Sequence, residues 1–253
     1  MDRAQQIADG LARVRERIAR AEQIAANLAA VRGRIAAAAE AAGRTPESVR
    51  LLAVSKKMPA DDVRAAIAAG QRAFGENYAQ ELRDKSALLA EDSTLPAPPE
   101  WHFIGPLQGN KVKYVAGKVT LLHSIDSPAL LDAVEARGAP QPCLIQVNIA
   151  AEASKKGIAP ADLPALLDRF AAMTQARCAG LMLIPPRGDA RPHFAALRAL
   201  RDREAAHARP NVELRELSMG MTDDLEIAVA EGATIVRVGT AIFGRRPPPA
   251  LSV

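Results

Sequence analysis

The sequence predicts a single α/β domain folded as a (β/α)8 TIM barrel. Its 253 residues match the ~250 that one such barrel needs. Eight short apolar runs follow one another at fairly even intervals, and segments with helical spacing lie between them. Strands that alternate with helices form a parallel sheet, and eight of them in this length favour a closed barrel over an open doubly wound sheet.

The expected strands mostly lack polar alternation, which is typical of parallel strands covered on both faces. They span residues 50–55, 73–76, 101–105, 121–125, 143–149, 179–184, 216–220 and 235–239. After the first run, Pro59 and Asp61 suit a helix start, and Gly70 suits the cap at its end. The same pattern predicts helices over residues 161–174, 193–208 and 222–232.

The N-terminal segment contains a repeat. LARVRERIARA (11–21) returns as LAAVRGRIAAA (28–38), 17 residues later. Because a helix turns by about 100° per residue, the second copy faces about 100° away from the first, so one straight helix cannot present both to one surface. We expect an N-terminal helical extension (1–22), a barrel (23–246) and a loosely ordered tail (247–253). An oligomer contact, a duplication without consequence or a misplaced start site would each explain the extension, and we favour an explanation without function.

Composition indicates an ordinary globular protein of the cytoplasm. Apolar residues make up 49% and charged residues 25%, with a formal net charge of +4 scattered along the chain. The sequence contains no stripe of basic residues interleaved with aromatics, so we do not expect nucleic-acid binding. No apolar stretch approaches the ~18 residues that a membrane span needs. Cys143 and Cys178 each open an apolar run, without metal-ligand spacing, so we interpret both as buried thiols in a reducing compartment.

Lysines close the first expected strand. In α/β barrels the reactive groups gather at the carboxyl ends of the strands. A desolvated lysine there can form an imine with a carbonyl, whereas a lysine at the rim can equally extend into solvent without any function. Because both faces of a barrel strand are covered, alternation does not choose between Lys56 and Lys57.

A second group of residues follows the last two strands. Ser218 to Thr222 lead into one helix, and Gly239 with Thr240 lead into another. Such loops commonly bind phosphate in this fold, although simple helix capping would use the same residue types. An imine-forming lysine opposite a phosphate site describes a sugar-phosphate aldolase or a protein that binds pyridoxal 5'-phosphate (PLP). Arg237 favours PLP, because an arginine can face the pyridine nitrogen.

At these residues the sequence resembles the YggS/PROSC-type pyridoxal phosphate homeostasis proteins, whose fold resembles the barrel of alanine racemase. The resemblance covers most of residues 51–246 in the family's order. It rests on LLAVSK (51–56), GQRAFGENYAQEL (70–82), WHFIGPLQGNK (101–111), HSID (123–126), IQVNIAAEASKKGI (145–158), GLMLIP (180–185) and SMGMTDDLEIAVAEGATIVRVGTAIFGRR (218–246).

The resemblance implies a site for PLP. Lys56 would carry the cofactor as a Schiff base, Asn77 would lie beside it, and Arg237 would face the pyridine nitrogen. Phosphate ligands would be Ser218, Thr222, Gly239 and Thr240. Two features depart from the family: Met58 stands where many relatives have a second lysine, and the N-terminal repeat lies outside the family's usual extent.

The resemblance also implies buffering or delivery of PLP without catalysis, with apo PLP-dependent enzymes as possible recipients. A two-base racemase needs a second acid or base on the far face of the cofactor. Tyr78 and Tyr114 lie outside any racemase-like motif, and no racemase-like β-domain follows the barrel, so we expect a monomeric carrier. The alternative is a PLP-dependent enzyme such as a weak amino-acid racemase.

Overall fold

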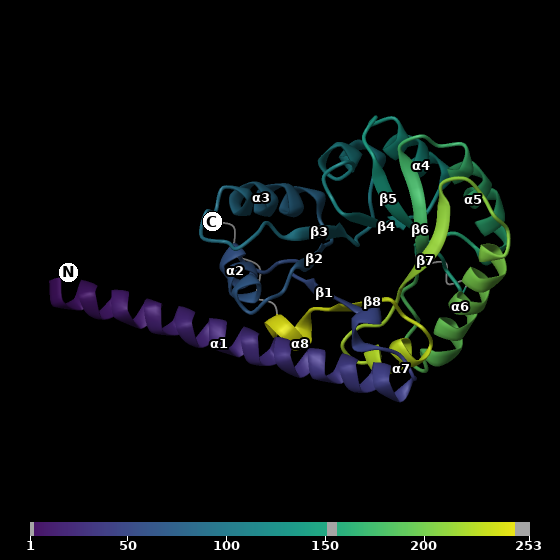
Figure 1. Cartoon of the computed structure of the whole chain (residues 1–253). Coiled ribbons are helices and arrows are strands. Elements are labelled where there is room, and N and C mark those ends of the chain that lie inside the picture. The colour runs from purple at the N-terminus through teal and green to yellow at the C-terminus, as the bar shows by residue number, and fades with distance from the viewer. Residues whose placement is uncertain (1–2, 151–155, 246–253) are drawn as a thin grey trace.

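A computed structural model describes residues 3–150 and 156–245 and contains a closed barrel of parallel strands (Figure 1). The strands follow one another around the barrel in sequence order, and β8 pairs with β1 to close it. The fold class predicted from the sequence is confirmed. The strands are β1 (Arg50–Val54), β2 (Ala73–Glu76), β3 (Glu100–Phe103), β4 (Leu121–Ile125), β5 (Gln141–Gln146), β6 (Ala176–Met182), β7 (Val212–Ser218) and β8 (Ile235–Val238).

Helices cover the outside of the barrel and connect its strands. They are α1 (Arg3–Ala41), α2 (Ala60–Ala68), α3 (Ala79–Ala90), α4 (Pro128–Glu135), α5 (Leu163–Ala171), α6 (Arg191–Ala205), α7 (Leu225–Ala230) and α8 (Thr240–Phe243), with the 3-10 turns η1 (Pro46–Ser48), η2 (Gly109–Tyr114) and η3 (Pro160–Asp162). Local chemistry explains where they begin. The Ser127 hydroxyl, for example, accepts a hydrogen bond from Leu130 N, and Pro128 opens α4.

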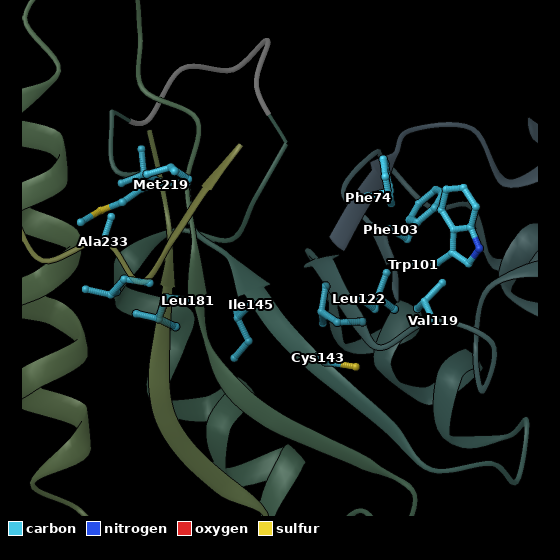
Figure 2. Close-up of a cluster of buried hydrophobic side chains, with 14 of the residues drawn as sticks. Phe74, Trp101, Phe103, Val119, Leu122, Cys143, Ile145, Leu181, Met219 and Ala233 are labelled. Atoms are coloured by element: carbon cyan, nitrogen blue, oxygen red, sulfur yellow. The ribbon is translucent and has the colours of Figure 1, made fainter. Parts of the chain in front are cut away.

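Two apolar layers stabilise the fold, one between strands and helices and one inside the barrel. Phe74, Trp101 and Phe103 belong to the outer layer, where the first two rings lie 5.9 Å apart (Figure 2). The inner layer consists of Leu52, Ala73, Ile104, Leu121, Leu144, Met182 and Ile235. Because alternate residues of each strand point inward, the polar residues of the strands can also enter the barrel interior.

Two strands begin three or more residues earlier than the sequence predicts. β6 starts at Ala176 and β7 at Val212, where exposed Glu213 and Arg215 alternate with buried Leu214. In the first residues of both strands, buried and exposed side chains alternate, so one face of the strand meets solvent. The unbroken apolar run that marks a strand covered on both faces is therefore missing there.

The packed N-terminal helix and its extension form one continuous helix, α1, whose N-terminal part projects beyond the barrel (Figure 1). Its buried residues all lie in the second half, from Ile24 to Ala39. The domain boundaries at residues 22 and 246 stay predictions, and the expected tail (247–253) lies outside the described residues. No helix in the described ranges is long and apolar enough to cross a membrane.

Candidate functional site

A cavity of about 250 Å³ opens at the carboxyl ends of β1, β2 and β8 and at the loop after β7. Its lining includes six of the seven residues that the sequence analysis singled out: Lys56, Asn77, Thr222, Arg237, Gly239 and Thr240. A larger groove of about 680 Å³ lies between α1 and α2, without any lysine in its lining. We place the site in the smaller cavity, because the imine-forming and anion-binding groups meet there.

The turn after β1 separates the two lysines that the sequence could not rank. Lys56 is half-buried and lines the cavity. Lys57 is exposed, with a left-handed backbone (φ 61°), and its Nζ lies 5.7 Å from the centre of the Tyr78 ring. The Lys57 backbone N–H donates to Glu81 Oε1, which fixes the turn in this conformation. Lys56 is therefore the lysine positioned to meet a carbonyl in the cavity.

A buried ionic cluster around Lys85 stabilises the turn after β1. This cluster was not predicted from the sequence. Lys85 Nζ on α3 donates to the Ser55 carbonyl at 2.7 Å, to Glu76 Oε1 at 2.8 Å and to Glu81 Oε1 at 2.7 Å. Ser55 Oγ donates to the same Glu76 oxygen. Burial raises the pKa of Glu76, and the charge of Lys85 opposes that shift. Glu76, an acidic residue at the end of the buried strand β2, was the feature of the sequence that could have indicated this cluster.

Asn77 follows β2, and the neighbouring backbone restricts its position. A Cβ added to Gly105 would overlap the backbone of Asn77, so only glycine permits this close approach. The side-chain oxygen of Asn77 is buried and has no hydrogen-bond partner among the described residues. Because buried acceptors are nearly always paired, this orphan oxygen at the cavity indicates a place for a donor from a bound molecule.

The expected phosphate loops lie on the α1 side of the cavity. Thr222 follows β7, and Gly239 and Thr240 follow β8. Arg34 of α1 donates to the Thr222 carbonyl at 2.8 Å, and Asn27 donates to the carbonyl of Ile242 in α8, also at 2.8 Å. Helix α1 therefore holds both loops in place from outside the barrel.

Arg237 enters the barrel interior beside these loops. Its side chain is buried, and its guanidinium donates to Ser218 Oγ at 2.8 Å and to the Leu183 carbonyl at 2.9 Å. Burial lowers the pKa of Arg237 to about 10, so it remains charged at neutral pH. Ser218 itself is fully buried and is not among the residues that line the cavity, whereas the other three expected phosphate ligands are.

Two buried histidines continue this hydrogen-bonded chain and were not predicted from the sequence. His123 Nδ1 lies 2.9 Å from Ser218 Oγ, and His123 Nε2 lies 2.9 Å from His102 Nδ1. Burial lowers the pKa of His102 to about 3 and that of His123 well below its usual range, so both rings are neutral. They come from adjacent strands, β3 and β4, and only barrel closure brings them to Ser218 and Arg237.

The arginine determines how the protons are arranged along this chain. Because a guanidinium only donates, the Ser218 hydroxyl is free to donate to His123 Nδ1. In this order His123 carries its proton on Nε2 and donates to His102 Nδ1. The proton of His102 is then on Nε2, a buried atom without a hydrogen-bond partner among the described residues. The opposite order leaves His102 Nε2 equally without a partner and, in addition, leaves the Ser218 hydroxyl proton unpaired, so the order that starts at Arg237 is favoured.

Known proteins resemble this chain over most of its length. Residues 26–247 match the family described as alanine racemase, N-terminal domain. A pyridoxal phosphate homeostasis protein of Pseudomonas aeruginosa is 48% identical over 212 residues, which cover 82% of this chain and 89% of that one. This chain belongs to the pyridoxal phosphate homeostasis protein family. The Escherichia coli K12 member is 45% identical over 209 residues, covering 81% and 88% of the two chains.

Solved structures extend the family comparison. PipY of Synechococcus elongatus, solved with PLP bound, is 38% identical with a TM-score of 0.75, and the match covers 87% of this chain and all of PipY. Alanine racemase of Corynebacterium glutamicum is 18% identical with a TM-score of 0.64, and the match covers 92% of this chain and 64% of the racemase. The second likeness shows the shared barrel fold alone.

Proposed function

We propose that this chain binds PLP in the cavity at the carboxyl ends of β1, β2 and β8, and that it buffers and delivers PLP without catalysing a reaction. The observation that carries the proposal is the convergence of Lys56, Arg237 and the two threonine-bearing loops on one cavity. Membership of the homeostasis protein family and PLP bound to PipY support it.

The lining residues fit the chemistry of PLP. Lys56 would hold the aldehyde of the bound cofactor, and the buried Arg237 guanidinium would lie on the side of the ring nitrogen. Thr222, Gly239 and Thr240 would bind the phosphate through hydroxyl and backbone N–H groups. In place of a phosphate contact, we assign Ser218 the task of holding Arg237.

Covalent labelling tests the cofactor and its lysine together. Purified protein incubated with PLP and reduced with borohydride should carry the cofactor on the peptide that contains Lys56, as read by mass spectrometry. Lys56→Ala should abolish the label and the visible absorbance of the Schiff base. Lys57→Ala is the matched control and should keep both, because Lys57 faces solvent. Labelling at Lys57, or equal labelling of the Lys56→Ala protein, would contradict the proposal.

The residues that line the cavity support the carrier role. Its ionisable groups are Lys56, Asp223 and Arg237, and Asp223 lies in the loop after β7 next to Thr222. Tyr78 is half-exposed outside this cavity, so it is not placed to act as the second base that a racemase needs on the far face of the cofactor.

Turnover and transfer distinguish a carrier from an enzyme. Proteinogenic amino acids should show no Cα–H exchange in deuterated water at enzyme-like rates, on the order of 1 s⁻¹. The loaded protein should instead reactivate an apo PLP-dependent enzyme, the class that we propose as its recipients in the cytoplasm. We expect neither nucleic acids nor membranes as partners of the PLP site. Exchange at an enzyme-like rate would favour the racemase.

A further inference from the structure

The N-terminal half of α1 presents an apolar stripe to solvent. Its members are about half exposed, between 50% and 56%, and lie on one side of the helix: Ile7, Leu11, Val14 and Ile18. They make up four of the eight large apolar side chains that are exposed in the described residues. Contiguous apolar surface on a helix that extends beyond its domain is typical of an interaction site.

This stripe duplicates a surface that already packs in the same molecule. Each member recurs 17 residues later as the identical residue type, and the second set is buried, with at most 4% exposure: Ile24, Leu28, Val31 and Ile35. The second set covers the side of the barrel between α2, α7 and α8. Since 17 residues rotate the helix by about 100°, the first copy faces away from that surface, and its side chains stay about half exposed among the described residues.

The spacing of the stripe makes it complementary to itself. Its steps of four, three and four residues form the heptad pattern of two-stranded helix pairs. The pattern is the same in both directions, so an antiparallel copy with its two-fold axis between residues 12 and 13 matches it fully. Ile7 then faces Ile18 of the partner subunit, and Leu11 faces the partner's Val14. We propose that residues 3–21 form an antiparallel helix pair with the same segment of a second copy of this chain.

The antiparallel direction also follows from the surroundings of the stripe. Arg20 binds Asp62 of α2 at 2.6 Å, and Arg17 approaches Asp61 at 3.7 Å, so α2 already covers one flank of the helix there. A parallel partner would bring its own α2 to this same end. An antiparallel partner places the two barrels at opposite ends of the pair, where each leaves the other's α2 uncrowded.

A groove of about 680 Å³ continues the stripe and enlarges the interface. Val14 and Ile18 form one wall of this groove, and Ala65 of α2 and Leu95 belong to the other. In the antiparallel pair the partner's Ile7 lies beside Ile18 and therefore enters this groove. The contact thus involves α2 as well as α1, and two-fold symmetry provides two such contacts in each dimer. This dimer and the monomer expected from the sequence exclude each other.

Mass measurement on stripe variants tests the pairing. Sedimentation of the full chain should give twice the chain mass at micromolar concentration. Leu11→Glu combined with Ile18→Glu should yield monomers, with a dissociation constant raised roughly 100-fold or more, because four unpaired charges would enter the interface. Ala12→Glu with Ala19→Glu adds the same charge on the opposite side of the helix and should leave the dimer intact. If the wild-type protein is still monomeric at a concentration of about 100 μM, the proposal is overturned.

Cross-linking tests the direction. A mixture of Ile7→Cys and Ile18→Cys proteins should form a mixed disulfide dimer, whereas neither protein alone should cross-link efficiently. The native Cys143 and Cys178 are buried and do not compete. Cross-linking of each variant with itself indicates a parallel pair and overturns the proposal. So does a monomeric protein that sediments with phosphatidylcholine vesicles containing phosphatidylserine, because the stripe would then bind lipid.

Discussion

At the scale of single residues, the site depends on groups that are buried in one charge state. Arg237 is charged, whereas the two histidines behind it are neutral, and Ser218 lies between them. A neutral histidine chain adds no second positive charge beside the guanidinium. The chain therefore fixes the position of Arg237 through hydrogen bonds, and we expect Arg237 to face the PLP ring with little freedom to move.

The neutral histidines predict a loss of stability in acid. The folded-state pKa of His102 is about 3, below the value of ~6.5 in an unfolded chain. Between these values the unfolded state binds more protons, so the free energy of unfolding falls as the pH falls from 6.5 towards 3. From pH 7 to pH 5, His102 should account for a loss of about 2 kcal/mol.

Urea unfolding at the two pH values checks this expectation. In His102→Gln the loss between pH 7 and pH 5 should be about 2 kcal/mol smaller than in the wild type, because one buried proton acceptor is gone. His207→Gln, at an exposed position, should leave the wild-type difference unchanged. An identical pH dependence for His102→Gln and wild type would show that His102 is not the buried neutral group described above.

At the scale of elements, α1 carries one apolar motif twice with opposite consequences. Its second half packs against the barrel and anchors the loops of the PLP site through Asn27 and Arg34. Its first half leaves the same side chains in water. The identical residues of the two copies therefore offer a direct comparison of what burial contributes.

Matched alanine substitutions measure that difference. Leu28→Ala removes a fully buried side chain and should lower the free energy of unfolding by about 2–5 kcal/mol. Leu11→Ala, at 53% exposure, should change it by less than about 0.5 kcal/mol at protein concentrations low enough to keep the chain monomeric. Denaturant titrations measure the free energy of unfolding of both variants. If the two substitutions lowered it equally, the packing of α1 described above would be contradicted.

At the scale of the whole molecule, the barrel brings strand ends that are distant in the sequence around one cavity. Lys56 follows the first strand and Arg237 lies on the last, and the pairing of β1 with β8 brings both to the lining of one cavity. A ligand that contacts both strand ends can bind the folded chain but not the unfolded chain. PLP binding should therefore stabilise the entire barrel.

Thermal unfolding measures this linkage. At a PLP concentration 100 times the dissociation constant, binding raises the free energy of unfolding by about 2.7 kcal/mol. For a domain of this size, this should raise the Tm by roughly 5–10 °C. Pyridoxine has neither the aldehyde nor the phosphate and should give a much smaller shift at the same concentration. Lys56→Ala should lower the shift with PLP. A shift that is equal for both ligands would argue against the proposed contacts.

The sequence by itself determined the barrel and most of the polar side chains that line the cavity. Alternating apolar runs and helical segments specify the fold, and a barrel always gathers its strand ends on one face, so Lys56, Asn77 and Arg237 could be placed there without coordinates. Family motifs then indicated PLP. These inferences depend on local patterns, which a sequence displays directly.

Only the tertiary structure decided the directions of side chains and their long-range contacts. Lys56 lines the cavity whereas Lys57, in a left-handed conformation, is exposed, and barrel closure brings His102 and His123 to Ser218. The exposure of Ile7 likewise depends on where α1 leaves the barrel surface. Such outcomes follow from contacts between residues far apart in the chain, and local periodicity carries no information about them.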